Sequence, residues 1–283
     1  MLTGVCLEEF CHPTCFVFMF VIIIIDVITS MRIGCNVNGQ MINLLCFADD
    51  MMLLSPSWVG LQMLIDKLHA LAVGINMTCN VNKTVCMGFN PLMSCKILSN
   101  TFPAFTVDNK ELVFMREFKY LGTVITDTLR DNCDIEREIR CLFVRCNILI
   151  SRFEFCSWHV KLRLFRTYYT CFYNIGLWRA YNVRTLHKFN SCYNKCLKRF
   201  FGFSKYSSLA AALLQTGLAS SSTVLHNFTW RFNDMLMACD NAVVSAVSSL
   251  CLYCNDLCSI FVFVCVCFCL TFFLSVCLCI CFV

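Results

Sequence analysis

The sequence predicts an α+β fold, in which a hairpin-centred antiparallel sheet with helices is followed by an all-α region and an apolar C-terminal segment. Two short apolar runs flank a polar break at 48–50, and apolar residues then recur at helical spacing over 61–72. A second strand-like hairpin at 117–125 precedes long segments with helical periodicity. The expected regions are a sheet region, a helical region, a linker with weak helical signals and an apolar tail, at residues 1–125, 126–205, 206–258 and 259–283.

The polar break contains two adjacent carboxylates, Asp49 and Asp50. The apolar runs Met41–Phe47 and Met51–Leu54 surround them, a pattern typical of a buried hairpin with its acids at the turn. Two carboxylates at one turn can share a pair of Mg²⁺ ions about 4 Å apart. The alternative is ordinary turn chemistry, since Asp favours turns by bonding to its own backbone.

The elements after this hairpin have local signals of their own. Ser55-Pro56 is a typical helix start, and Gly74 marks the end of the same helix. A polar turn is expected at 76–82, a strand at 85–89 and a tight hairpin at 117–125, where a glycine follows aromatic residues. The order is therefore strand, helix, strand and hairpin.

A helix is expected over Asp134–Phe153, where acidic and basic residues alternate. The charges are spaced three and four residues apart, which is typical of a solvated helix face with surface ion pairs. The residues concerned are Arg137, Arg140, Arg145, Asp134, Glu136 and Glu138.

Residues 155–233 contain no Asp or Glu, against eleven Lys and Arg. A block of one sign neutralises phosphates and binds nucleic acid in a salt-dependent manner. The residues predicted to contact a nucleic-acid backbone are Lys161, Arg163, Arg166, Lys195, Lys198 and Arg199. The interleaved aromatics can stack on bases, but their near-helical spacing favours a place in the core. These aromatics are Tyr168, Tyr169, Trp178, Tyr181 and Tyr193.

Hydrophobic residues make up 58% of the chain, above the usual fraction for a soluble protein. The excess lies in Phe16–Ile25 and Ile260–Val283, and the second run has 24 residues without a charge. About 20 suffice to cross a bilayer, so 260–283 is a transmembrane candidate. Its repeated Cys, Phe, Val, Leu and Ile equally fit translated simple-sequence DNA. The expected location is a membrane if this tail inserts, and otherwise the nucleus or cytoplasm.

The chain has 25 cysteines, but a secreted disulfide scaffold is not expected. Glu8 and Glu9 stand where a secretory signal would carry basic residues. Two Cys/His groups lack the two well-separated pairs of a structural zinc site. These groups are Cys6, Cys11, His12 and Cys15, and His187, Cys192 and Cys196.

Three motifs follow one another about 30 residues apart: Phe47-Ala48-Asp49-Asp50, Asn80-x-x-Lys83-Thr84, and Phe118-Lys119-Tyr120-Leu121-Gly122. In order and spacing they resemble the reverse transcriptases of non-LTR (LINE-like) retrotransposons, over roughly residues 1–205. The resemblance implies part of a right-hand polymerase palm followed by a helical thumb. It also implies an RNA-directed DNA polymerase that uses an RNA template, a DNA primer, deoxynucleotides and Mg²⁺, or Mn²⁺ in its place.

The resemblance also implies roles for individual residues. Asp49 and Asp50 match the metal-binding catalytic carboxylates, and Lys83 matches a lysine that neutralises the leaving pyrophosphate. The residues implied in nucleotide or primer binding are Phe47, Phe118, Tyr120, Leu121 and Gly122.

The chain departs from this family before the hairpin. The family uses a further upstream aspartate and a fingers domain, and the 48 residues before Asp49 are too few for either. Asp26 matches an acid that follows a helical motif, so it is a weak substitute for that ligand. The expectation is a polymerase fragment that is inactive by itself. The alternative is a non-enzymatic retroelement remnant that binds nucleic acid or is anchored in a membrane.

Overall fold

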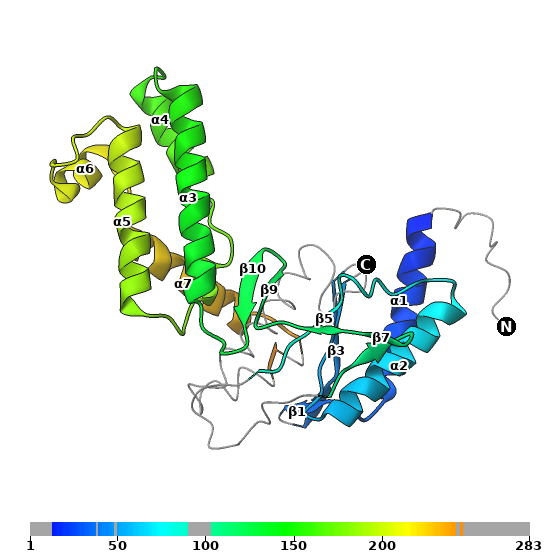
Figure 1. Ribbon diagram of the computed structural model, residues 1–283. Helices are drawn as coiled ribbons and strands as arrows, with labels where there is room; N and C mark the ends of the chain where they lie inside the picture. The colour runs from blue at the N-terminus through cyan, green and yellow to red at the C-terminus, as the bar shows by residue number, and fades with distance from the viewer. Residues whose placement is uncertain (1–12, 38, 48–49, 90–102, 242–243, 246–283) are drawn as a thin grey trace.

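The computed structural model describes residues 13–37, 39–47, 50–89, 103–241 and 244–245. The predictions made for Asp49 and for the tail at 260–283 therefore lie outside the described residues. Figure 1 shows a strand lobe (13–126) and a helical lobe (131–237), and the hairpin at 117–126 is the part of the strand lobe that lies next to the helical lobe. Each lobe has its own hydrophobic core.

The strand lobe contains short strands in pairs. They are β1 (Cys35–Val37) with β2 (Gln40–Ile42), β3 (Leu44–Phe47) with β4 (Asp50–Leu53), β6 (Thr106–Val107) with β7 (Lys110–Glu111) and β9 (Glu117–Tyr120) with β10 (Thr123–Thr126), all antiparallel, and β5 (Val85–Cys86) with β8 (Val113–Phe114), parallel. Across the described residues these pairs are separate two-stranded sheets rather than the single hairpin-centred sheet that was expected. The strands are only two to four residues long, which leaves few positions for further pairing.

Asn43 divides the first apolar run between two hairpins. Its buried side-chain amide donates to the carbonyl oxygens of Ile28 (2.7 Å) and Met31 (2.9 Å), at the end of α1 (Pro13–Ser30). These bonds satisfy carbonyls that a helix leaves unpaired at its C-terminus. Gly34 (φ +154°) approaches the same residue so closely that a Cβ would lie 2.7 Å from the Asn43 Cβ.

Helix α2 (Trp58–Gly74) covers the hairpin of β3 and β4. It begins later than expected, because Ser57 and not Ser55 is the N-cap, with its hydroxyl accepting from the Gly60 N–H at 3.2 Å. It ends at Gly74 as expected. Leu64 and Ile65 are fully buried and fix this helix on the strand-lobe core.

The helical lobe is built on α3 (Asn132–Phe153) packed against α5 (Val183–Phe200). The remaining elements are α4 (Trp158–Leu164), the π-helix η1 (Phe165–Tyr169), the 3₁₀ helix η2 (Ile175–Leu177), α6 (Leu209–Thr216) and α7 (Ser221–Met237). Aromatic rings fill the core, as in the stacked pair Phe165–Tyr169 with centroids 4.3 Å apart. The expectation that most aromatics are core residues is confirmed for Tyr169, Trp178 and Tyr193, whereas Tyr168 is exposed.

The expectation of a solvated charged face on α3 is wrong for Asp134 and Glu138. Both are fully buried. Glu138 pairs with Arg137 and Arg145, and Asp134 accepts from the Trp178 indole N–H at 2.8 Å. Because α3 packs against α5 and β10, this face of the helix meets protein rather than water.

The expected linker at 206–258 contains α6 and α7. Helix α7 packs on η2, where a Cβ on Gly176 would lie 2.8 Å from the Phe228 carbonyl oxygen. Leu236 in the last turn of α7, and Cys239 and Val244 after the helix, belong to or pack on the strand-lobe core. Helix α7 therefore connects the two lobes. Within the described ranges, no helix combines the length and the apolar character needed to span a bilayer.

Candidate active site

Strands β3 and β4 form the buried hairpin that the sequence predicts. Their register pairs Leu44 with Leu53 at one end and Phe47 with Asp50 at the other. Residues Leu45, Cys46, Met51 and Met52 lie in the core, which fixes both strands. Asp50 is half-buried at the first position of β4, so its carboxylate lies at the end of a rigid element.

The turn before β5 is organised by Asn80. The Asn80 carbonyl oxygen accepts from the Thr84 hydroxyl at 2.9 Å, and its side-chain oxygen accepts from the Lys83 N–H at 3.3 Å. Thr84 is buried, whereas the Lys83 side chain is exposed. The Asn80-x-x-Lys83-Thr84 spacing thus forms a local turn that presents the lysine to solvent.

Strands β9 and β10 form the second predicted hairpin. Leu121 (φ +41°) and Gly122 (φ +83°) occupy its two-residue turn, and positive φ at both positions suits a right-twisted hairpin. The Tyr120 side chain is 1% exposed and lies in the core, while Lys119 is exposed. The family resemblance implies that Tyr120 contacts the primer, but its side chain is buried and anchors the hairpin in the core.

The three motif segments meet in one hydrophobic core. Met51 from β4, Cys86 from β5 and Tyr120 from β9 belong to the same buried cluster, although they lie far apart in the sequence. Burial raises the pKa of the Cys86 thiol to about 12, so this side chain is a neutral core residue at physiological pH. The hairpin of Asp50, the strand after the Lys83 turn and the hairpin of Gly122 therefore each contribute a side chain to the same core.

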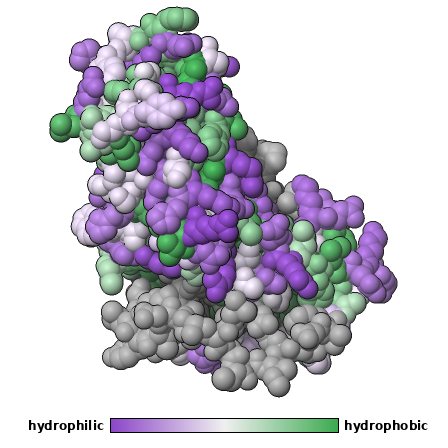
Figure 2. Space-filling model, turned by 60° about the vertical axis from the view of Figure 1, so that its left-hand side comes forward, coloured by the Kyte–Doolittle hydropathy of each residue, from purple (hydrophilic) through white to green (hydrophobic). Residues whose placement is uncertain are grey.

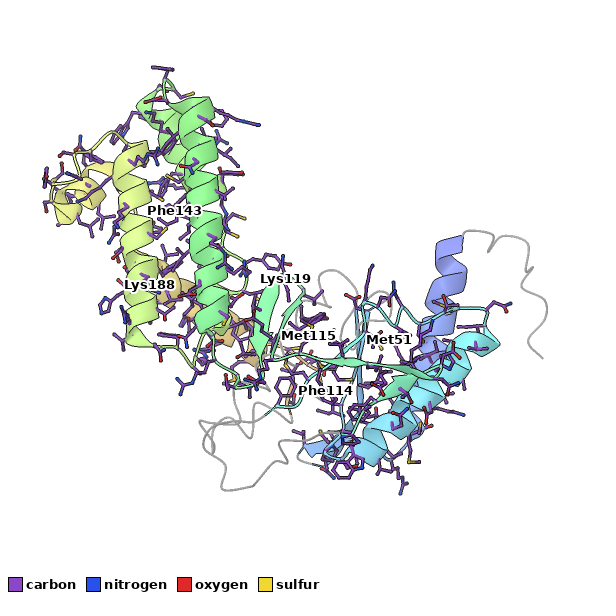
Figure 3. The ribbon with its side chains drawn as sticks, viewed as in Figure 1. Met51, Phe114, Met115, Lys119, Phe143 and Lys188 are labelled. Carbon is purple, nitrogen blue, oxygen red and sulfur yellow. The ribbon has the colours of Figure 1, made fainter. Side chains whose placement is uncertain are left out.

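The hairpin of β9 and β10 is bonded to the helical lobe. The Val124 N–H donates to the Asp134 carboxylate at 2.9 Å, and the Asn174 amide donates to the Thr123 hydroxyl. Figure 3 shows this hairpin, marked by Lys119, between the helical lobe and Met51. The position of the hairpin thus depends on both lobes.

Asp131 fixes the segment that precedes α5. Its carboxylate accepts from the backbone N–H groups of Arg179 and Ala180, both at 2.7 Å. Burial raises the pKa of this carboxyl to about 6 and the nearby Asp134 adds to the shift, while the two backbone bonds oppose it.

Four of the six cations predicted to contact a nucleic-acid backbone make contacts within the helical lobe. Lys161 lies over the Phe200 ring, and the other three bond to carbonyl or amide oxygens. The pairs are Arg166 with Gly217, Lys198 with Lys205 and Ser207, and Arg199 with Asn147. Arg163 and Lys195 are exposed.

Arg184 and Lys188 belong to the predicted basic block but not to the six cations listed as backbone contacts, and Arg140 was predicted only as part of a solvated helix face; all three lie on exposed faces of α3 and α5. The four-residue spacing of Arg184 and Lys188 was the signal that could have found them.

Adjacent carboxylates at the end of a hairpin match the oxygen donors that Mg²⁺ prefers. Asp50 supplies one such carboxylate from a half-buried position, and Asp49 lies outside the described residues. In the part of the chain that the structure describes, no group of three or more His, Cys, Asp or Glu side chains could hold a metal ion.

Comparison with known proteins finds a partial relative. The chain is 30% identical over 113 residues, 38% of its length, to the retrovirus-related Pol polyprotein from the type-2 retrotransposable element R2DM of Drosophila melanogaster. The match spans one tenth of that polyprotein. No family model and no solved structure matches the chain. The partial match supports a retrotransposon-related origin for this chain.

Proposed function

We propose that this chain is part of an RNA-directed DNA polymerase of a non-LTR retrotransposon, with a palm-like strand lobe and a thumb-like helical lobe. The observation that carries the proposal is the common core of the three motif segments. The relation to a retrotransposon Pol polyprotein supports it. Because the match covers only one tenth of that relative, the chain is proposed as a segment of the polymerase, and DNA synthesis by this chain alone is not part of the proposal.

In this proposal Asp49 and Asp50 hold Mg²⁺ or Mn²⁺ at the end of the β3–β4 hairpin. When bound, the metal supplies Lewis-acid stabilisation of the charge that develops in phosphoryl transfer. The exposed ammonium of Lys83 supplies further positive charge for the leaving pyrophosphate. The β9–β10 hairpin presents Lys119 and Gly122 to the primer strand, with the buried Tyr120 as its support.

The test measures metal binding at the hairpin directly. We would titrate the purified chain with Mn²⁺ in the presence of an RNA–DNA template–primer and a non-hydrolysable deoxynucleotide, and follow free Mn²⁺ by electron paramagnetic resonance. The double variant Asp49→Asn/Asp50→Asn should bind Mn²⁺ at least tenfold more weakly than the unaltered chain. Asp108→Asn/Glu111→Gln is the matched control, because it removes two exposed acids from another hairpin of the same lobe and should change the affinity less than twofold.

Equal Mn²⁺ affinity for all three proteins would reject the metal site. RNA-templated primer extension with Mg²⁺ then tests synthesis, with Asp49→Ala and Asp50→Ala as variants. Extension that both substitutions abolish would extend the proposal to full activity of this chain. The same signal from the unaltered chain and both variants would show that the product does not come from this site.

The second candidate is a nucleic-acid-binding protein of retroelement origin without catalytic activity. The one-signed charge of residues 155–233 favours it. The two candidates differ in the metal titration, because the second predicts salt-dependent nucleic-acid binding with no effect of the Asp49→Asn/Asp50→Asn variant on Mn²⁺ affinity.

A further inference from the structure

A groove runs between α3 and α5 on the outer side of the helical lobe. Its volume is about 640 Å³, within the ~300–1,000 Å³ typical of small-molecule sites. Ile139 and Cys192 are among its apolar lining residues, and charged side chains also line it. Figure 2 shows hydrophilic residues gathered over the middle of this lobe.

Cations from both helices line the groove. Arg184, Lys188 and Lys195 lie on one face of α5, four and seven residues apart, and Arg140 faces them from α3. The opposite face of α5 is buried in the core, so these side chains are held on the solvent side. His187 adds a nitrogen donor on the same face.

Among the described residues, Glu136 is the one acidic residue that lines the groove. Its carboxylate pairs with the Lys188 ammonium at 2.9 Å, with both side chains about half exposed. An exposed pair of this kind is weak, so Lys188 can exchange it for a phosphate. Four cations against one acid leave the groove strongly positive.

Phe143 supplies a ring beside these charges. It lines the groove from α3, and 42% of its surface is exposed. Figure 3 labels Phe143 and Lys188 on the two helices that form the groove. An exposed aromatic ring among cations is the combination that proteins use for unpaired nucleotides, because bases stack on the ring while phosphates contact the charges.

We propose that this groove binds a segment of single-stranded nucleic acid, with one base stacked on Phe143 and the flanking phosphates on Arg140, Arg184, Lys188 and Lys195. The paired bases of a duplex are stacked on one another and cannot reach a ring between two helices, whereas an unpaired base can. This proposal adds to the proposed function, because it states that the helical lobe binds nucleic acid in single-stranded form. The biological role of this binding rests on the proposed function, whereas the binding itself can be tested independently of it.

The test is fluorescence anisotropy of the full chain with a labelled 12-nucleotide single-stranded RNA, at several salt concentrations. The triple variant Arg184→Gln/Lys188→Gln/Lys195→Gln should bind at least tenfold more weakly at 0.1 M salt. It should also reduce the slope of log affinity against log salt by about 2, because each lost phosphate contact in a single strand contributes about 0.7. Phe143→Ala should bind about tenfold more weakly with an unchanged slope, since stacking releases no counterions.

The matched control is Arg32→Gln/Lys67→Gln/Lys110→Gln, which removes three exposed cations from the strand lobe. It should leave the affinity within twofold of the unaltered chain, and circular dichroism should show all variants folded. Tighter binding of an RNA–DNA duplex of equal length, or equal competition by inorganic polyphosphate together with no effect of Phe143→Ala, would overturn the proposal. Neither result bears on Mn²⁺ binding at Asp49 and Asp50, so the two proposals fail separately.

Discussion

The two lobes solve the problem of a stable core in different ways. The strand lobe buries aliphatic side chains such as Leu45, Leu64 and Ile65 between short hairpins and two helices. The helical lobe buries aromatic rings together with two acids and their arginine partners. Aliphatic packing is non-directional, whereas ion pairs and hydrogen bonds require defined geometry. Removing a buried polar side chain from the helical lobe should therefore lower the free energy of unfolding more than removing a buried apolar side chain from the strand lobe.

The largest effect is expected from Glu138→Ala in the helical lobe. The change removes the buried carboxylate shared by Arg137 and Arg145. Arg137 keeps its pair with Asp134, whereas Arg145 is left with the Tyr169 carbonyl oxygen as its hydrogen-bond partner. Breaking a buried ion pair in this way costs about 3–5 kcal/mol of the free energy of unfolding. Urea denaturation followed by circular dichroism at 222 nm measures it.

Glu136→Ala is the matched control on the same helix. Its pair with Lys188 is exposed, so the loss should be about 0–1 kcal/mol. Equal effects of the two substitutions would show that burial of the ion pair does not distinguish the helical lobe.

Leu64→Ala should have the next largest effect, in the strand lobe. The side chain is fully buried, and truncation of a buried leucine costs about 2–5 kcal/mol through lost burial and the cavity that remains. Tryptophan fluorescence mainly follows the helical lobe, which contains Trp158, Trp178 and Trp230. If the lobes unfold separately, Leu64→Ala should not change the denaturation midpoint measured by tryptophan fluorescence. An equal shift of the midpoints measured by fluorescence and by circular dichroism would show that the lobes unfold as one unit.

Gly176→Ala tests the contact between η2 and α7. The new methyl group would lie 2.8 Å from the Phe228 carbonyl oxygen, so the backbone of α7 must shift. We expect a loss of about 1–3 kcal/mol, as for other overpacked sites. Gly74→Ala, where a Cβ meets no atom within 4 Å, is the control and should be neutral or slightly stabilising. Thermal unfolding of both variants gives the answer.

The smallest effect is expected from Asp131→Asn, and it depends on pH. The folded-state pKa of about 6 lies above the ordinary value, so the folded protein retains this proton at pH values where the unfolded chain has lost it. This carboxyl therefore contributes stability that falls as the pH rises from about 4 to about 6. The asparagine can accept the same two backbone bonds without that loss.

The full pKa shift corresponds to about 3 kcal/mol, and the partial exposure of Asp131 reduces it, so the variant should gain roughly 1–2 kcal/mol relative to the unaltered chain between pH 4 and pH 7. Urea denaturation of both proteins across this range measures the difference. A constant difference at every pH would mean that the Asp131 carboxyl titrates at its ordinary pKa.

Features with a local cause were predictable from the sequence. The hairpin of β3 and β4 follows from two apolar runs around a polar break, and that of β9 and β10 from a glycine after aromatic residues. The end of α2 at Gly74 has an equally local signal. The N-cap of α2 was assigned two residues early because Ser55 and Ser57 are both suitable, and their surroundings decide between them.

Features that depend on distant partners were not predictable. The burial of Asp134 follows from the Val124 N–H and the Trp178 indole, which reach it only in the folded chain. For the site, the motif spacing suggested a family resemblance, and the shared core of the three segments is a feature that the spacing alone did not predict. The predicted nucleic-acid contacts of the cations stay predictions, and the sequence did not show that Arg166 and Lys198 donate to carbonyl oxygens within their own lobe. Charge along a sequence does not show which charges the fold itself uses.

Helix α7 holds the two lobes together, because it contacts both of them. Its Phe228 and Phe232 lie against Gly176 of the helical lobe. Leu236 in its last turn packs on the core of the strand lobe, together with Cys239 and Val244. A polypeptide shortened to residue 205 would lose this tether and uncover apolar surface in both halves. Expression trials should therefore retain the chain to at least residue 245, even though the recognisable motifs end much earlier.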